Sequence, residues 1–373
     1  MKQIRQLAAA IEEDLAKKMV FIGGPRQVGK TTLAKSLTVD EAYLNWDFPD
    51  DRQRILKHEL PTKYKCLVLD EIHKYKNWRS LVKGYYDKFH EKFRIVVTGS
   101  ARLDHFRKGG DSLMGRYHYY RLHPFTVDEL PLLPKKRTLQ DLFNFGGFPE
   151  PLLAQNEREL KRWHNERIYR VINDDVRDLQ NVKEISQIEL LATILPTKVG
   201  SPLSFRSISE DLQVAPRTVE SWIGILDNLY YIYRISPYGA PKIRAVKKEN
   251  KLYMWDWSQV EDLGTRFENM VAGHLLKYCH YLEDYNGEKM ELRFLRDTDK
   301  REIDFVVIKN KKPIFAVECK TGEKQLSPWI NYFKMRTPIP KFYQVHLGTK
   351  DFGLPENGRV IPFEKFITEC LGV

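Results

Sequence analysis

Apolar residues in the first third of the chain gather in short continuous runs, separated by polar turns and by stretches with helical periodicity. Such runs lie within 19–24, 65–74 and 93–101, and the helical pattern TTLAKSL follows the first of them. Strands that are apolar throughout are typical of a parallel sheet with helices on both faces. The pattern therefore predicts an α/β domain in this part of the chain.

Helical periodicity dominates the middle of the chain. A long helix is predicted within 156–179, and three shorter helical patterns follow it. The third of these has its apolar residues at helical spacing: Val219, Trp222, Ile223, Leu226 and Leu229. A hairpin-like stretch with a basic tip covers 231–255. Beyond it we expect a helix at 263–278 and two buried strands around a lysine-rich turn within 301–322.

Composition narrows the class of protein. A chain of 373 residues suggests two or three domains. There is no signal-peptide core and no apolar run long enough to span a bilayer, so we expect a soluble, cytoplasmic protein without a membrane partner. The cysteines lack paired spacing, which argues for reduced thiols and against a disulfide framework or a zinc site: Cys66, Cys279, Cys319 and Cys370.

The charge of the chain points to a polyanionic partner. The formal net charge is +11 and the pI is near 9.2. Nucleic acid is the commonest partner of a basic soluble protein. A generally basic, solvated surface is the alternative.

The first apolar run leads into a phosphate-binding pattern. Residues 24–31, GPRQVGKT, fit G-x-x-x-x-G-K-S/T. Gly24 and Gly29 let the backbone curl so that its N–H groups face the phosphates of ATP. Lys30 is expected to reach the β- and γ-phosphates, and Thr31 to hold Mg²⁺. Thr32 completes the expected nucleotide-binding set.

Two acids end the second strand. Asp70 suits the Mg²⁺ shell, and Glu71 suits a base that polarises an attacking water, since ligands bind at the carboxyl ends of strands in an open α/β sheet. Ser100, after the third strand, is a candidate contact to the γ-phosphate or the water; a helix cap is its alternative. Arg116 is a candidate finger supplied to a neighbouring subunit, or an ordinary exposed arginine.

Helix, turn, helix and basic hairpin in the middle of the chain predict a winged helix. Arg217 and Thr218, at the start of the second helix, are candidate DNA contacts. The hairpin tip supplies basic candidates: Lys242, Arg244, Lys247 and Lys248. Winged helices also serve as protein-interaction modules, and that alternative stays open.

The two C-terminal strands carry charges where apolar residues would cost less free energy. Asp304 lies on one strand, while Glu318 and Lys320 point to the same side of the other. With Glu268 from the preceding helix, they predict an oxygen-only site for Mg²⁺ or Mn²⁺, at which Lys320 steadies a nucleophilic water or the developing charge in phosphodiester hydrolysis. A structural salt-bridge cluster is the alternative.

Several segments, in this order, resemble the prokaryotic AAA+ ATPases grouped with archaeal origin-recognition-like proteins: GPRQVGKTTL, LVLDEIHK, VVTGSA, GRYHYYRLHPFTVDEL and GGFPEP. Members carry a C-terminal domain of unknown function with a PD-(D/E)XK nuclease-like fold. The C-terminal segment is itself similar to those nucleases, with Asp304, Glu318 and Lys320 matching the motif and Glu268 the helical acid that some members use.

The resemblance implies an α/β protein of four parts. These are an AAA+ core at 1–135, a helical lid at 136–183, a winged helix at 184–256 and a restriction-endonuclease-like α/β domain at 257–373. We expect an ATP-hydrolysing, DNA-directed homo-oligomer with ATP and Mg²⁺ as cofactors and with metal-dependent cleavage as a further activity. The alternatives are an ATP-gated DNA- or protein-binding switch with an inactive nuclease-like fold, and a hexameric DNA remodeler or branch migrator.

Overall fold

A computed structural model describes residues 5–61, 63–99, 113–172, 185–239 and 249–372. The chain divides into two compact units, one of residues 1–125 and 129–136 and the other of residues 126–128 and 137–373. Within the described residues, no helix is both long enough and apolar enough to cross a membrane.

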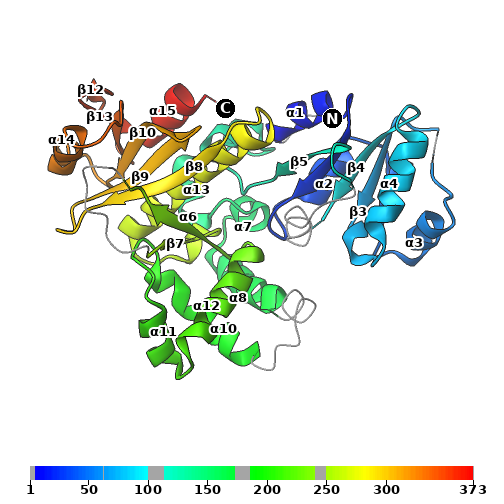
Figure 1. Cartoon of the computed structure of the whole chain (residues 1–373), viewed down its shortest axis with the longest axis horizontal. Helices are drawn as coiled ribbons and strands as arrows, with labels where there is room; N and C mark the ends of the chain where they lie inside the picture. The colour runs from blue at the N-terminus through cyan, green and yellow to red at the C-terminus, as the bar shows by residue number, and fades with distance from the viewer. Residues whose placement is uncertain (1–4, 62, 100–112, 173–184, 240–248, 373) are drawn as a thin grey trace. The chain divides into compact units, whose positions relative to one another are not determined.

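A five-stranded parallel sheet forms the centre of the first unit (Figure 1). Its order is β2-β3-β4-β1-β5. The strands are β1 (Met19–Gly23), β2 (Tyr43–Asn45), β3 (Cys66–Asp70), β4 (Arg94–Thr98) and β5 (Tyr117–Arg121). The expected strands within 19–24, 65–74 and 93–101 are confirmed as β1, β3 and β4.

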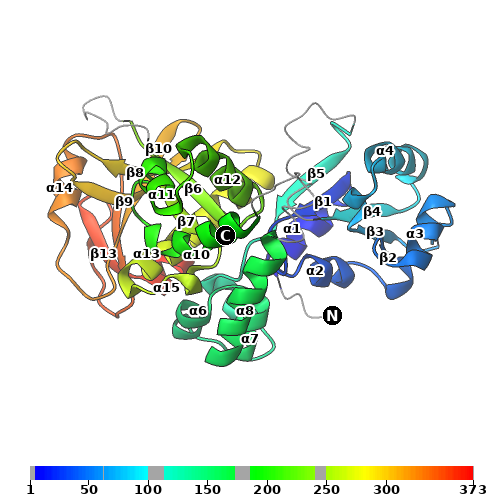
Figure 2. The same cartoon turned by 90° about the horizontal axis from the view of Figure 1, so that it is seen from below.

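Helices cover both faces of this sheet, and α2 and α4 lie on opposite sides of it in Figure 2. The helices are α1 (Leu7–Asp14), α2 (Lys30–Ser36), α3 (Pro49–Leu56) and α4 (Trp78–Phe89). Phe21, Leu69 and Val97 pack with Trp78 and Val82 of α4 in one buried cluster. Alternation along the strands sends their neighbours, buried as well, to the other face. Burial on both faces explains why the strands are apolar throughout.

The second unit begins with helices. They are α6 (Leu139–Phe145), α7 (Pro149–Ala154), α8 (Glu157–Arg170), α10 (Ile185–Ile194), α11 (Phe205–Leu212) and α12 (Pro216–Asn228). The long helix expected within 156–179 is confirmed as α8 up to Arg170. The three shorter helical patterns are confirmed as α10, α11 and α12, with every apolar residue of the third pattern buried.

An eight-stranded mixed sheet follows, in the order β12-β13-β11-β10-β9-β8-β6-β7. The strands are β6 (Ile232–Pro237), β7 (Lys251–Met254), β8 (Met290–Arg296), β9 (Glu302–Lys309), β10 (Lys312–Cys319), β11 (Phe342–His346), β12 (Phe352–Leu354) and β13 (Gly358–Pro362). The helices are α13 (Leu263–Asp284), α14 (Pro328–Lys334) and α15 (Phe363–Phe366). The sheet meets α13 along β7, β8, β9 and β10.

The hairpin expected within 231–255 belongs to this same sheet. β6 pairs antiparallel with β7, and it pairs in parallel with β8 through Ser236–Arg293 and Pro237–Phe294. One continuous sheet therefore crosses the domain boundary expected between residues 256 and 257.

The ladder between β8 and β9 contains a β-bulge. From the pair Arg293–Val306 to the pair Leu295–Ile303, β8 advances by two residues and β9 by three. Asp304 lies within this irregular step. Bulges re-aim side chains, and they are common next to functional sites.

Candidate functional site

The loop between β1 and α2 has the backbone that its glycines predict. Gly24 has φ +132°, and a Cβ atom there would lie 2.4 Å from the carbonyl oxygen of Leu122. Gly29 has φ +100° and caps the start of α2. Both positions favour glycine, because side chains rarely adopt such φ values. The loop is therefore closed tightly between β1 and β5.

Lys30 is buried and reaches back across this loop. Its Nζ donates to the carbonyl oxygens of Gly24 at 2.9 Å and Pro25 at 2.6 Å. The ammonium thus lies over the curled backbone where a phosphate group is expected. Thr31 and Thr32 are exposed on the first turn of α2.

Asp70 joins α2, β2 and β4 at the end of β3. Thr31 Oγ1 donates to its Oδ2 at 2.8 Å, Tyr43 OH donates to the same oxygen at 2.5 Å, and the Thr98 hydroxyl donates to Oδ1. Burial, followed by the hydrogen bond to Asp70, raises the pKa of Tyr43 well above its ordinary value. The expected magnesium pair, Thr31 and Asp70, is thus in direct contact.

Tyr43 and Thr98 are contacts that the sequence did not reveal. Thr98 follows an apolar run at a strand end, which is a usable signal. Tyr43 begins a strand of three residues, too short to show a period.

Glu71 follows Asp70 with a left-handed backbone, φ 55°. Its carboxylate is partly exposed, and Oε2 lies 3.4 Å from Lys74 Nζ and 3.7 Å from His73 Nε2. Lys74 in turn bonds Asp47 at 2.5 Å. The expected base therefore has a cationic neighbour of its own.

Ser100 lies outside the described residues. Arg116, directly before β5, donates from Nε to Asp87 Oδ1 of α4 at 2.8 Å. This bond lowers the pKa of the Asp87 carboxyl. The arginine proposed as a finger is thus bonded within its own unit in this structure.

The expected DNA-contacting helix is α12, which follows α11 after a turn at Gln213 with φ 53°. Arg217 is exposed and Thr218 is half-buried in its first turn. The basic hairpin-tip candidates lie outside the described residues: Lys242, Arg244, Lys247 and Lys248.

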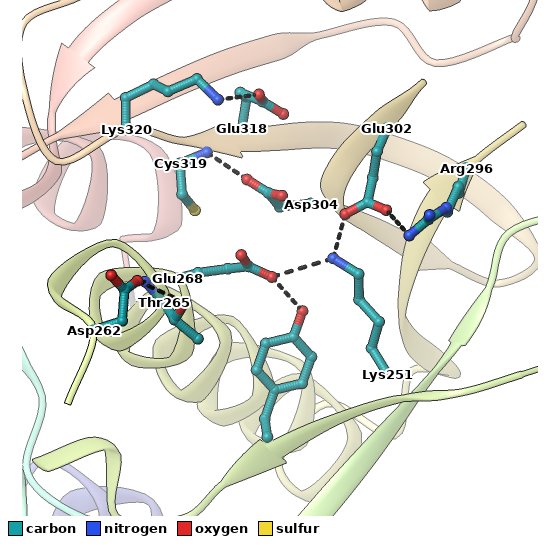
Figure 3. Close-up of polar contacts among 11 residues, drawn as sticks. Lys251, Asp262, Thr265, Glu268, Arg296, Glu302, Asp304, Glu318, Cys319 and Lys320 are labelled. Atoms are coloured by element: carbon teal, nitrogen blue, oxygen red, sulfur yellow. Dashed lines mark hydrogen bonds and ion pairs between the residues drawn. The ribbon is translucent and has the colours of Figure 1, made fainter. Parts of the chain in front are cut away.

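The C-terminal carboxylates lie near one another in the second unit (Figure 3). The charge of Asp304 acts on both Glu268 and Glu318, and that of Glu268 also acts on Glu318. Asp304 Oδ2 accepts from the Cys319 backbone N–H at 2.7 Å. The residues expected from α13, β9 and the end of β10 are therefore brought together.

Glu318 is buried, and its two carboxylate oxygens differ in their hydrogen bonding. Lys320 Nζ donates to its Oε1 at 2.6 Å, which confirms that the two side chains share a side. Its Oε2 is buried and has no hydrogen-bond partner among the residues that the structure describes. Burial, together with the charge of Asp304, raises the pKa of Glu318. A buried carboxylate oxygen without a donor is a place where a cation would stabilise the fold.

Glu268 is held by two residues that the sequence analysis did not select. Its Oε1 accepts from Lys251 Nζ at 3.2 Å and from Tyr253 OH at 2.7 Å. Lys251 also pairs with Glu302, whose second oxygen bonds Arg296 at 3.1 Å. Burial and the charge of Asp304 raise the pKa of Glu268.

The chemistry of these carboxylates favours a bound divalent cation, whereas their arrangement does not. Carboxylate oxygens are the ligands that Mg²⁺ and Mn²⁺ prefer, and the bare oxygen of Glu318 is available. Across the part of the chain that the structure describes, however, no group of three or more His, Cys, Asp or Glu residues is arranged to hold a metal ion. The chemistry of these residues therefore fits a divalent cation, while the described carboxylates are not arranged as a three-ligand site in this structure.

Comparison with known families identifies the first unit. Residues 16–131 match the family model described as an AAA domain. Residues 136–263 match a domain of unknown function, DUF8612, and residues 263–366 match another, DUF4143. The chain therefore carries an AAA-type, ATPase-like domain built on a parallel α/β sheet, followed by a further sheet-containing unit. An ATPase of this type is expected to use ATP and Mg²⁺.

Two relatives that match most of the chain are described as uncharacterised proteins. One protein of Methanocaldococcus jannaschii is 24% identical over 368 residues, covering 86% of this chain and 80% of the relative. One of Mycobacterium tuberculosis is 23% identical over 376 residues, covering 98% and 84%.

Two solved structures are distantly similar. The Orc1 protein of Aeropyrum pernix, solved in complex with DNA, shares 15% identity and covers 70% of this chain and 90% of its own, with a TM-score of 0.33. A signal transduction ATPase with numerous domains from Pyrococcus horikoshii shares 13% identity and covers 74% and 47%, with a TM-score of 0.23. Likenesses this distant identify no function.

Proposed function

We propose that this chain is an ATP-hydrolysing, DNA-directed AAA+ protein whose second unit carries a site for Mg²⁺- or Mn²⁺-dependent phosphodiester hydrolysis. The observation that supports the ATPase activity most directly is the contact between Thr31 and Asp70. It joins the phosphate-binding loop to the acidic strand end, the two parts that hold nucleotide and Mg²⁺ in P-loop enzymes.

In this proposal each residue of the first unit has a defined task. Lys30 would leave the loop carbonyls to bind the β- and γ-phosphates, while Thr31 and Asp70 would hold Mg²⁺. When bound, the cation would neutralise phosphate charge. Glu71 orients a water and takes its proton as the water oxygen bonds to the γ-phosphorus and the β–γ P–O bond breaks. Ser100 contacts the γ-phosphate or the water. Arg116 would exchange Asp87 for a neighbouring subunit's phosphate in a homo-oligomer.

In the second unit Asp304 and Glu318 would hold the divalent cation. Bound there, a cation polarises the phosphate and lowers the pKa of a water. Glu268 completes the acidic set, and Lys320 stabilises the charge that develops on the phosphate. The buried, unpartnered oxygen of Glu318 supports this assignment.

DNA is the proposed substrate because the chain has a net charge of +11 and an exposed arginine at the start of α12. Arg217 and Thr218 would contact the backbone or bases. The basic residues at 242–248 would add phosphate contacts.

A second candidate is an ATP-gated binding switch in which the second unit does not cut. One observation favours it. Asp304 is bonded by the Cys319 N–H and Glu318 by Lys320, and the described residues contain no three-ligand group arranged for a metal.

The ATPase activity is tested with Lys30→Ala and Glu71→Gln. Lys30→Ala should weaken ATP binding by about 1.5–3 kcal/mol, since it removes a charged hydrogen-bond donor. Glu71→Gln should bind ATP normally and lose at least about a hundredfold in turnover, as expected for a lost general base. Glu91→Gln, an exposed acid of the same unit, is the control. Normal turnover by Glu71→Gln would remove that residue from the base role.

The cleavage activity is tested on labelled linear, forked and four-way DNA with Mn²⁺ or Mg²⁺. Asp304→Asn should lose nicking and Mn²⁺-dependent stabilisation while keeping ATP hydrolysis, because the nucleotide site lies in the other unit. If the wild type shows neither nicking nor a rise in melting temperature with Mn²⁺, the switch is the better description.

A further inference from the structure

Two side chains of β7 donate hydrogen bonds to the same carboxylate oxygen of Glu268. Lys251 and Tyr253, two positions apart and hence on one face of the strand, both donate to Oε1. Lys251 is 1% exposed and Tyr253 is fully buried. β7 comes from the segment expected to form the wing of the winged helix. Glu268 is therefore anchored by a strand outside the expected nuclease-like domain.

The position of Lys251 is fixed from a second side. A buried ammonium costs several kcal/mol unless it is paired. Glu302, at the start of β9, supplies a second carboxylate, and Arg296 Nη1 donates to the other oxygen of Glu302 at 3.1 Å. Lys251 Nζ also lies 5.5 Å from the centre of the Phe294 ring. These contacts leave the ammonium little freedom to move.

Backbone closes off the side of Glu268 near residue 200. Gly200 has φ +73°, and a Cβ there would lie 3.2 and 3.3 Å from the two oxygens of Glu268. The Gly200 N–H donates to the Leu252 carbonyl of β7 at 3.1 Å. One side of the carboxylate is thus covered by β7 and by the segment bonded to it.

We propose that Lys251 and Tyr253 are positioning residues that aim Glu268 at Asp304 as the third carboxylate of the divalent-cation site. Both donors occupy Oε1, and Figure 3 draws the other oxygen of Glu268 on the side of Asp304. Hydrogen bonds from outside the ligand shell commonly fix ligand orientation in this way. This inference rests on the metal site of the proposed function.

The test is a double-mutant cycle on Mn²⁺ affinity, with free Mn²⁺ measured by electron paramagnetic resonance on the full chain. Lys251→Met should weaken Mn²⁺ binding by about tenfold. In a Glu268→Gln background the same substitution should change affinity by less than about twofold, because its effect passes through Glu268. Water proton relaxation should report an additional Mn²⁺-bound water in Lys251→Met, as in Glu268→Gln.

Tyr253→Phe keeps the ring and removes only the hydroxyl. It therefore tests the same positioning of Glu268 if Lys251→Met fails to fold. It should weaken Mn²⁺ binding in the same direction, and Lys251→Arg should restore part of the affinity. Glu291→Gln, which breaks the partly exposed pair with Arg293 on β8, is the matched control and should have no effect.

Three outcomes overturn the inference. If Lys251→Met and Tyr253→Phe bind Mn²⁺ as tightly as the wild type, or more tightly, these residues do not position a ligand, although the metal site itself stands. If the wild type binds no Mn²⁺, the metal site falls and this inference falls with it. Equal loss from Lys251→Met with and without Glu268 would also contradict the proposal.

Discussion

At the scale of single residues, buried polar groups decide how the second unit is held together. Asp256 is fully buried and accepts from Trp163 Nε1 at 3.1 Å and from Ser258 Oγ at 2.6 Å. His164 Nε2 lies 2.9 Å from the same serine hydroxyl. A Cβ at Gly146 would lie 2.7 Å from Asp256 Oδ1. The cluster ties α8 and the GGFPEP segment to the stretch before α13.

This cluster predicts a pH dependence of stability. Burial lowers the pKa of His164, and Arg167 and Arg266 lower it further against the opposing charge of Asp256. A histidine with a depressed folded-state pKa contributes stability above its ordinary pKa near 6.5, and that stability is lost as the pH falls below it. Each unit of depression corresponds to about 1.4 kcal/mol. His164→Asn should therefore flatten the decline in melting temperature between about pH 7 and pH 5.

The control for this measurement is Asn165→Ala, at the neighbouring exposed position of α8, which should follow the wild-type curve. A His164→Asn protein that loses stability with acid as steeply as the wild type would show that other groups govern this range.

At the scale of elements, many of the candidate site residues lie at the ends of strands and helices. The described residues proposed to bind nucleotide lie after β1 and at the end of β3, at the carboxyl edge of a parallel sheet, where ligands bind in such folds. The carboxylates of the second unit come from α13, the bulged start of β9 and the end of β10. The candidate DNA contacts Arg217 and Thr218 lie in the first turn of α12, whose first residue is Pro216.

The DNA-binding proposal is tested on α12 and the basic segment after β6. Replacing Lys242, Arg244, Lys247 and Lys248 with Ala should weaken binding to all sequences. The slope of log binding constant against log salt concentration should become shallower by about one for each phosphate contact removed, because fewer counterions are released. Arg217→Ala should add to the loss. Arg162→Ala, exposed on α8, is the control, and unchanged affinity and salt slope in the fivefold variant would assign this surface to a protein partner.

At the scale of the whole molecule, the two proposed activities lie in different compact units. Thr31, Asp70 and Glu71 belong to the first, and Glu268, Asp304 and Glu318 belong to the second. Each site has its own core and its own acidic groups. Substitutions in one unit should therefore leave the chemistry of the other unit intact, while any coupling between them would appear as an effect of ATP on DNA binding.

Oligomerisation is the prediction at this scale. If Arg116 acts in trans, ATPase activity per subunit should rise with protein concentration, and Arg116→Ala subunits mixed with wild type should reduce activity below simple dilution. An arginine finger contributes about 10³–10⁵-fold to turnover. Lys88→Ala, an exposed cation on α4, is the control. Activity proportional to wild-type content at every dilution would indicate that each chain works alone.

Features that depend on residues close together in the chain could be predicted from the sequence alone. The loop from Gly24 to Thr31, the apolar strands β1, β3 and β4, and the helical spacing of α12 all follow from residues close together in the chain. The acids Glu268, Asp304 and Glu318 could be selected because a charge in an apolar strand or at a helical face stands out against its neighbours.

The tertiary structure decided which distant groups meet. Tyr43 reaches Asp70 from the neighbouring strand, Arg116 bonds Asp87, and Lys251 reaches Glu268 although β7 lies in the segment expected to form a wing. Pairing between strands far apart in sequence leaves no period to detect, and the bulge at Asp304 exists only where two strands lie in register. The contacts that hold the candidate ligands in place therefore follow from the packing of the sheet, whereas the candidates themselves could be chosen from the sequence.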